Sequence, residues 1–157
     1  MSPYRVRPAT LDDVEAIVHH RLAMFAEMGT PVEISVVETA FRRWLRDKLP
    51  AGTYLAWLVE DAGREVVAGG GATVLPWPPG PRYVGGRLAF VYNVYTEPAH
   101  RRRGLARLVM EAIHAWCREN GIGLVGLNSS QAGRTLYETM GYEPASSPMM
   151  FAAVERD

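Results

Sequence analysis

Three consecutive arginines, Arg101 to Arg103, stand directly before Gly104 and a run with helical spacing of apolar residues. The first N–H groups of a helix have no acceptor within the helix, and the positive end of the helix dipole lies there. Because Gly104 and Ala106 carry little side-chain bulk, a ligand can approach this backbone closely. Arginines beside such N–H groups favour a pyrophosphate or another polyanion. The segment therefore predicts a polyanion site at the start of a helix.

Two common phosphate-binding motifs do not match this turn. No Gly-Lys-Ser/Thr follows the glycine, which excludes a P-loop, and the three glycines of the dinucleotide fingerprint are missing. The chain of 157 residues has 17 basic and 17 acidic residues, so the arginines form a local patch on a balanced chain. A dedicated nucleic-acid-binding protein usually carries an overall basic excess. Binding of nucleic acid is therefore disfavoured.

The remaining composition is typical of one globular domain, which we expect to span residues 1–157. A single cysteine, Cys117, excludes an internal disulfide and fits a reducing compartment. No spacing suggests a metal or redox pair, so we expect no metal and a packed thiol at Cys117. The N-terminus lacks an apolar signal segment, and no run reaches the ~20 apolar residues of a membrane span. We expect a cytoplasmic protein without a membrane partner. Lys48 is the only lysine, which with abundant Gly, Ala and Pro suggests a bacterial genome rich in GC.

The pattern of apolar residues predicts the elements that hold the basic turn in place. Helical spacing and caps such as Thr10 predict helices over 10–28, 35–49, 105–119 and 133–140. Apolar or alternating runs predict strands over 4–8, 53–60, 65–74, 88–96, 122–127, 142–143 and 149–154. Three glycines at 69–71 indicate a bulge or a close backbone approach. The proline-rich loop 75–81 would hold Trp77 as a lid over a site or as a plug on the core.

The order strand, polyanion turn, helix, strand and short helix resembles the GNAT N-acetyltransferase superfamily. The family's loop pattern Arg/Gln-x-x-Gly-x-Gly/Ala is matched by residues 101–106, and Thr96-Glu97-Pro98 resembles its usual end of the preceding strand. Residues 130–142 are similar to its second signature, Asn-x-x-Ala-x-x-Leu-Tyr-Glu-x-x-Gly-Phe. The resemblance implies an α/β (α+β) fold, with a mixed, mostly antiparallel sheet of six to seven strands flanked by about four helices. The implied order is β-α-α-β-β-β-α-β-α-β(-β).

The resemblance also implies acetyl-CoA as the acyl donor and gives a role to each matching residue. Backbone N–H groups from Arg102 to Arg107 would hold the coenzyme pyrophosphate. The main chain of Val94 and Thr96 would bind the pantetheine arm, and the Val94 amide would support the oxyanion. Tyr137 matches the tyrosine that protonates the leaving thiolate; otherwise it is a core aromatic. The expected coenzyme-binding residues are Val94, Tyr95, Thr96, Arg101, Arg102, Arg103, Gly104, Leu105, Ala106, Arg107, Asn128, Ser130, Gly133 and Tyr137.

The sequence departs from the family pattern at three positions. Ser130 replaces the motif's Asn and Gly133 replaces its Ala, so the coenzyme contact could come from Ser130 or from Asn128. Val125 stands where some members carry a glutamate as general base, so that base is absent. Other residues or water must then take the proton of the acceptor. The titratable candidates are His19, His20, Glu27, Glu33, Glu97 and His100.

These observations predict direct transfer of an acetyl group to a primary amine. We expect a small-molecule acceptor, because the residues that would wall its site are apolar or aromatic. These residues are Met24, Phe25, Met28, Trp77, Tyr83 and Tyr92. One alternative is a coenzyme-binding sensor without turnover; another is a protein or RNA acceptor docked on basic residues such as Arg42, Arg43 and Arg46. A homodimer is expected from the resemblance only.

Overall fold

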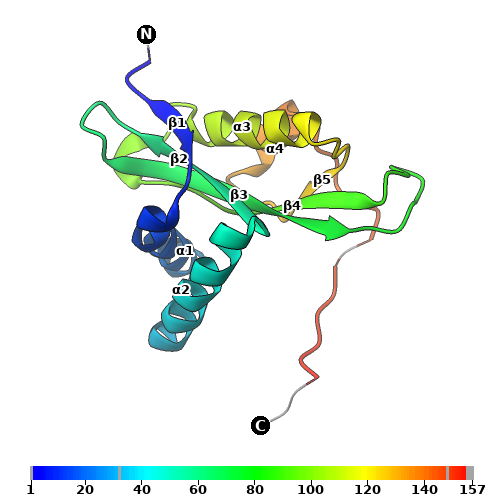
Figure 1. The fold of residues 1–157 in the computed structure, drawn as a ribbon, viewed down its shortest axis with the longest axis horizontal. Helices are drawn as coiled ribbons and strands as arrows, with labels where there is room; N and C mark the ends of the chain where they lie inside the picture. Colours follow the sequence, from blue (N-terminus) through cyan, green and yellow to red (C-terminus); the bar gives the residue numbers. More distant parts are fainter. Residues whose placement is uncertain (1, 32, 148, 155–157) are drawn as a thin grey trace.

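The computed structural model describes residues 2–31, 33–147 and 149–154. Within them lies a sheet in the order β1-β2-β3-β4-β5, in which β1 to β4 pair antiparallel and β5 pairs parallel to β4. The short β5 ends early, so half of β4, residues 92–96, runs on past it (Figure 1). The strands are β1 (Arg5–Pro8), β2 (Tyr54–Glu60), β3 (Val66–Pro76), β4 (Arg87–Thr96) and β5 (Val125–Leu127).

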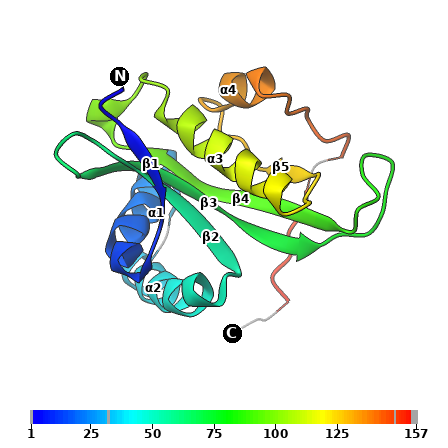
Figure 2. The same ribbon diagram turned by 45° about the horizontal axis from the view of Figure 1, so that its top comes forward.

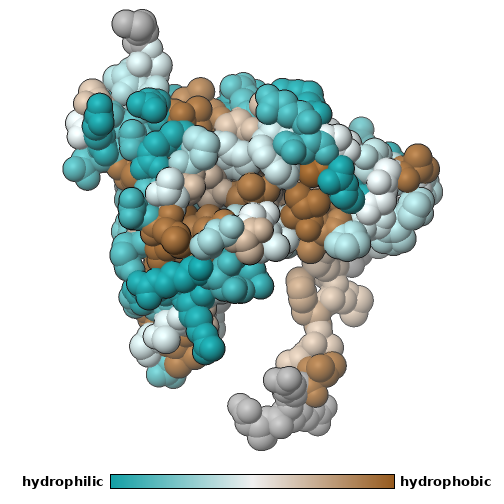
Figure 3. Space-filling view, in the orientation of Figure 1, coloured by the Kyte–Doolittle hydropathy of each residue, from teal (hydrophilic) through white to brown (hydrophobic). Residues whose placement is uncertain are grey.

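Helices cover both faces of this sheet (Figures 1 and 2). One face carries η1 (Leu11–Asp13), α1 (Val14–Met28) and α2 (Ile34–Ala51); the other carries α3 (Leu105–Glu119) and α4 (Arg134–Thr139), and η2 (Pro98–His100) leads into α3. Two separate apolar clusters fill the layers, one beneath α3 and one beneath α1 and α2. In Figure 3 hydrophilic residues cover the outer helix surfaces, and hydrophobic residues gather between the layers. The predicted order of helices and of the first five strands is confirmed.

The first helix begins as the sequence predicts. Thr10 and Asp13 form a capping box around η1. Arg7 on β1 donates to both carboxylate oxygens of Asp13 at 2.8 Å and to Glu60 at 2.5 Å. Asp13 is buried, and its hydrogen bonds to Arg7 hold the pKa of this carboxyl below its usual range. This cluster therefore joins β1, β2 and the start of α1.

Strand β4 carries a bulge opposite the three glycines of β3. Two residues of β4, Asn93 and Val94, stand opposite the single residue Gly70. Asn93 takes a left-handed conformation with φ 59°. A Cβ on Gly70 would lie 2.9 Å from the Val109 side chain and 3.0 Å from that of Val94, so only glycine fits without displacing them. The close approach predicted from the glycine run is confirmed, and the extra residue lies on the neighbouring strand.

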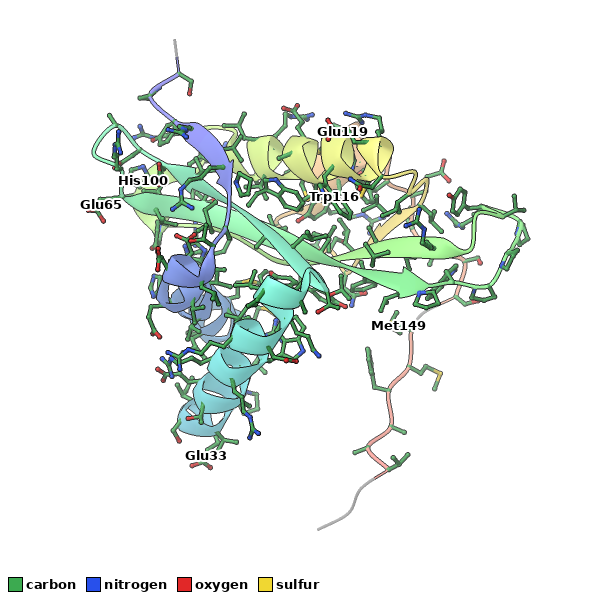
Figure 4. All side chains as sticks on the ribbon, viewed as in Figure 1. Glu33, Glu65, His100, Trp116, Glu119 and Met149 are labelled. Atoms are coloured by element: carbon green, nitrogen blue, oxygen red, sulfur yellow. The ribbon has the colours of Figure 1, made fainter. Side chains whose placement is uncertain are left out.

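The two strands predicted after α4 are wrong. Among the described residues the sheet has five strands, and neither 142–143 nor 149–154 pairs with it. Tyr142 instead ends the α4 turn, because its N–H donates to the Tyr137 carbonyl at 3.0 Å and its hydroxyl lies 2.6 Å from His114 on α3. Pro144 then removes a backbone donor that a ladder would need. Met149 lies on a segment that runs away from the sheet (Figure 4).

No helix in the described part of the chain is both long enough and apolar enough to span a bilayer.

Candidate active site

An open edge of β4 lies beyond the end of β5. Pairing with β5 covers residues 89–91 of β4, and no described strand covers this edge at 92–96. The N–H of Glu97 donates to a carbonyl of β3 at 2.8 Å. Because N–H groups alternate in direction along a regular strand, that of Thr96, next to Glu97, turns toward the open edge; Val94 lies in the bulge, where this pattern is interrupted. The edge therefore offers the main-chain groups that a linear amide-containing ligand could pair with.

The loop between η2 and α3 presents unpaired N–H groups. Arg102 and Gly104 are left-handed, with φ 61° and 77°. Within residues 2–31, 33–147 and 149–154, none of the N–H groups from Arg102 to Arg107 donates to a protein acceptor; the first donor of α3 is Leu108, to Gly104 at 3.1 Å. A methyl group on Gly104 would meet no protein atom within 4 Å. Such a nest at a helix start binds phosphate groups, so these residues fit a coenzyme pyrophosphate.

The three arginines of this turn differ in their partners. Arg101 donates from Nε to the carbonyl of Thr96 at 2.9 Å and forms an ion pair with Glu27. Arg103 donates to the hydroxyl of Tyr4 at 3.2 Å. Arg102 is exposed and has no side-chain partner among the residues described. Of the three, Arg102 is therefore the side chain most available to a phosphate.

Helix α4 places Tyr137 against the core beneath α3. Arg107 on the first turn of α3 donates to the hydroxyl of Thr139 at 2.7 Å, which ties the two helices together. Tyr137 and Val94 both pack against this core. The Tyr137 hydroxyl has no hydrogen-bond partner in the described residues, and burial raises the pKa of this phenol. The hydroxyl therefore stays protonated at neutral pH and can donate to a departing thiolate.

The turn before α4 explains why glycine at position 133 replaces the alanine of the family motif. A Cβ on Gly133 would lie 2.9 Å from the ring of Tyr137, so glycine at this position lets the ring lie close to the turn. The hydroxyl of Ser130 accepts the N–H of Gly133 at 3.1 Å. Asn128 is exposed after the end of β5. Asn128 and Ser130 both remain predicted coenzyme contacts.

Three of the candidate bases lie at the meeting of α1 and the end of β4. His19 Nε2 lies 2.5 Å from Glu97 Oε1, at an exposed position. His20 is 2% exposed, and its ring centroid lies 5.1 Å from that of Tyr95. Burial lowers the pKa of His20 to about 4, so it is neutral at pH 7 but enclosed by protein. Of this group the His19–Glu97 pair is the one that solvent and an acceptor can reach.

The other candidate bases are engaged elsewhere or lie far away. Glu27 is paired with Arg101. His100 Nδ1 lies 3.0 Å from the hydroxyl of Tyr4, on the side of β1. Glu33 is at the free end of α2, away from the sheet (Figure 4). His100 and Glu33 therefore lie away from the open edge of β4, whereas Glu27 is held near it through Arg101, which also donates to the Thr96 carbonyl.

The predicted acceptor wall is assembled only in part. Phe25 and Tyr92 lie on the α1 and α2 face, around the side chain of Arg21. Tyr83 does not belong to this wall. Its hydroxyl accepts a hydrogen bond from the N–H of Gly123 at 3.1 Å, near β5. Trp77 is 42% exposed on the loop between β3 and β4, so it is not a plug on the core. This loop extends from the end of the sheet opposite to α1 (Figure 1).

A hydrogen-bonded network at the bulge was not predicted from the sequence. Arg21 on α1 donates from Nη1 to Oδ1 of Asn93 at 2.7 Å, and Nδ2 of Asn93 donates to the hydroxyl of Tyr54 at 2.9 Å. Asn93 and Tyr54 are both buried, and burial raises the pKa of Tyr54 to about 12. A polar residue inside an otherwise apolar strand is the one sequence signal that could have pointed to Asn93.

Known proteins of one family are similar to this chain in sequence and in fold. The model of the acetyltransferase (GNAT) family matches residues 17–142. A GCN5-related N-acetyltransferase from Ralstonia eutropha JMP134 is 32% identical, with a TM-score of 0.87 over 95% of this chain and 98% of that one. A predicted acetyltransferase with acetyl-CoA from Clostridium acetobutylicum is 22% identical, with a TM-score of 0.85 over 95% and 96%. An aminoglycoside N-acetyltransferase in complex with CoA is 15% identical, with a TM-score of 0.77 over 98% and 97%. No curated protein sequence matches this chain.

Proposed function

Because this chain belongs to the GNAT acetyltransferase family, we propose that it transfers an acetyl group from acetyl-CoA directly to the primary amine of a small-molecule acceptor. The observation that carries the proposal is the run of unpaired N–H groups from Arg102 to Arg107 at the start of α3. The open edge of β4 continues from this nest and can bind the amide groups of a pantetheine arm. Acetyl-CoA or CoA bound in similar structures supports the choice of donor.

In the proposed reaction the neutral amine nitrogen attacks the thioester carbonyl carbon. The N–H of Val94 donates to the carbonyl oxygen as negative charge develops on it. The carbon–sulfur bond then breaks, Tyr137 donates a proton to the departing sulfur, and the Tyr137 phenolate regains a proton from water. The proton that the amine loses passes to water at the open edge, and no side chain is assigned as its base. The products are the N-acetylated amine and free coenzyme A.

Most of the rate gain would come from positioning. An amine and a thioester react without covalent help from a protein, so holding them together in the correct orientation removes most of the entropic barrier. A covalent route through Cys117 is disfavoured, because this thiol is 2% exposed in the core beneath α3. Burial also raises the pKa of the Cys117 thiol, which lowers its thiolate fraction. Homodimer formation and a cytoplasmic location stay predictions from the sequence.

The function is tested by two measurements on the purified full chain. Acetyl-CoA at ~100 times its dissociation constant should raise the free energy of unfolding by about 2.7 kcal/mol, whereas adenosine alone should not. Release of free thiol from acetyl-CoA across a panel of amines then tests transfer. Stabilisation by acetyl-CoA together with amine-dependent thiol release supports the proposal. Stabilisation without release from any amine would favour the sensor, and no stabilisation would refute coenzyme binding.

A further inference from the structure

The guanidinium group of Arg21 is a half-buried cation that no carboxylate of the described residues neutralises. It lies 4.9 Å from the ring centroids of both Phe25 and Phe41, and its Nη1 donates to the neutral amide oxygen of Asn93 at 2.7 Å. In the described part of the chain no Asp or Glu forms an ion pair with it. Burial lowers the pKa of Arg21, yet an arginine keeps its charge at neutral pH.

Two other arginines whose side chains are hydrogen-bonded have carboxylate partners instead. Arg7 lies between two carboxylates, and so does Arg42. Removing a cation from water without an opposite charge is unfavourable, and this penalty is recovered when an anion binds. The aromatic rings hold the Arg21 fork in place, and Asn93 occupies one of its five N–H donors. The remaining N–H groups can donate to the two oxygens of a carboxylate or phosphate.

The position of Arg21 relates this charge to the reaction. Its partner Asn93 is a bulge residue of β4 and directly precedes Val94, whose N–H is proposed to contact the thioester. Arg21 comes from α1, so it lies on the face opposite to α3 and α4. In the proposed function the coenzyme is held from the α3 side, which leaves the α1 and α2 face for the acceptor. The side chain of Arg21 is therefore hydrogen-bonded to the residue that precedes the main-chain N–H proposed to contact the thioester.

Resting on the proposed function, we infer that the acceptor amine carries an anionic group, a carboxylate or a phosphate, and that Arg21 binds it. The anion would then orient the acceptor so that its amine nitrogen reaches the thioester beside Val94. Arg21 acts as a specificity-determining residue and takes no part in bond making. This inference names the class of acceptor that the apolar wall alone does not define.

Paired acceptors that differ only in the anion test this inference. Glycine is compared with glycinamide, and phosphoethanolamine with ethanolamine, in the thiol-release assay. The wild-type protein should show a kcat/KM at least tenfold higher for one anionic member than for its neutral partner. Arg21→Gln keeps an N–H donor for Asn93 but loses the charge, so this ratio should fall to about one. Arg42→Gln, which removes the same charge from the ion pairs with Glu15 and Glu38, should keep the wild-type ratio.

A second measurement does not depend on turnover. The unfolding midpoint of the protein saturated with coenzyme A is measured with N-acetylglycine, N-acetylglycinamide and N-acetyl-phosphoethanolamine. An anionic product should raise the midpoint in the wild type but not in Arg21→Gln, with Arg21→Lys as a charge-retaining variant should the glutamine variant not fold. Any of three results would overturn the inference. They are a wild-type kcat/KM ratio near one, an equal loss of kcat/KM for both members of a pair in Arg21→Gln, and a wild-type midpoint that neither anionic product raises. Failure of all amines to release thiol would refute transfer, while the midpoints still decide whether Arg21 binds an anion.

Discussion

Replacing Gly104 by alanine tests the anion-binding loop, and a second glycine of the chain provides a matched control variant. Gly104 has φ 77°, and a methyl group there meets no protein atom within 4 Å. The substitution therefore adds only backbone strain to the free protein, about 1 to 2 kcal/mol for a left-handed residue. The same methyl group adds bulk to the loop whose N–H groups, from Arg102 to Arg107, are proposed to hold the pyrophosphate.

The matched control is Gly52→Ala at the end of α2. Gly52 has φ 69° and is equally open, with no protein atom within 4 Å of an added Cβ. Both variants should lose a similar free energy of unfolding in the absence of ligand, which corresponds to about 2 to 4 °C in Tm per kcal/mol for a chain of this size. Any difference between them in the presence of acetyl-CoA therefore reports on the loop and not on strain.

The assay is thermal unfolding with and without acetyl-CoA at about 100 times the wild-type dissociation constant. The wild type and Gly52→Ala should gain about 2.7 kcal/mol. A hundredfold loss of affinity would leave Gly104→Ala with a gain of about 0.4 kcal/mol at the same concentration. Full stabilisation of Gly104→Ala by acetyl-CoA would refute the assignment of this loop as the pyrophosphate site.

Three further substitutions address the leaving group and the fold. Tyr137→Phe should lower kcat about 100-fold, since it removes the proton donor, and should leave the KM for acetyl-CoA within about twofold; wild-type turnover would remove this role. The pKa of about 4 for His20 lies below its unfolded value of 6.5, so its contribution to stability is present above pH 6.5 and lost as the pH falls. Between pH 7 and pH 4 the wild type should lose about 3 kcal/mol more than His20→Gln in urea unfolding, and equal losses would contradict the burial of a neutral imidazole. Arg7→Met leaves Asp13 and Glu60 without their cation and should lower the free energy of unfolding by about 2 to 3 kcal/mol at pH 7. The stabilisation that comes from the lowered pKa of Asp13 is complete above the ordinary pKa of 3.8 and declines below it. The loss should therefore be smaller at pH 3, whereas a loss independent of pH would contradict the ion pair.

Local signals in the sequence were sufficient to predict the parts of the fold that depend on residues close together in the sequence. The capping box at Thr10, the turn before Gly104 and the apolar stripe of α3 each lie within a few residues, and all three are present in the structure. The glycine run at 69–71 indicated a close approach for the same reason. The turn with unpaired N–H groups at the start of α3 could thus be predicted from the sequence alone.

Features that join distant residues could not be predicted in this way. The contact between Arg21 and Asn93 spans 72 residues, and that between Asn93 and Tyr54 spans 39. The prediction of two strands after α4 was also wrong, because a short apolar run such as 149–154 is compatible with a strand but does not specify a partner. In both cases the outcome depends on tertiary packing and not on local pattern.

The main claim is that the N–H groups of Arg102 to Arg107 and the open edge of β4 bind coenzyme A. Titration of the ¹⁵N-labelled protein with coenzyme A, followed by the backbone amide resonances, tests it directly. The account predicts the largest shifts at residues 102–107, Val94 and Thr96. A different cavity of about 350 Å³, lined by His114, Cys117 and Tyr142 among others, lies at the opposite end of α3. Shifts confined to that cavity, with residues 102–107 unmoved, would contradict the account.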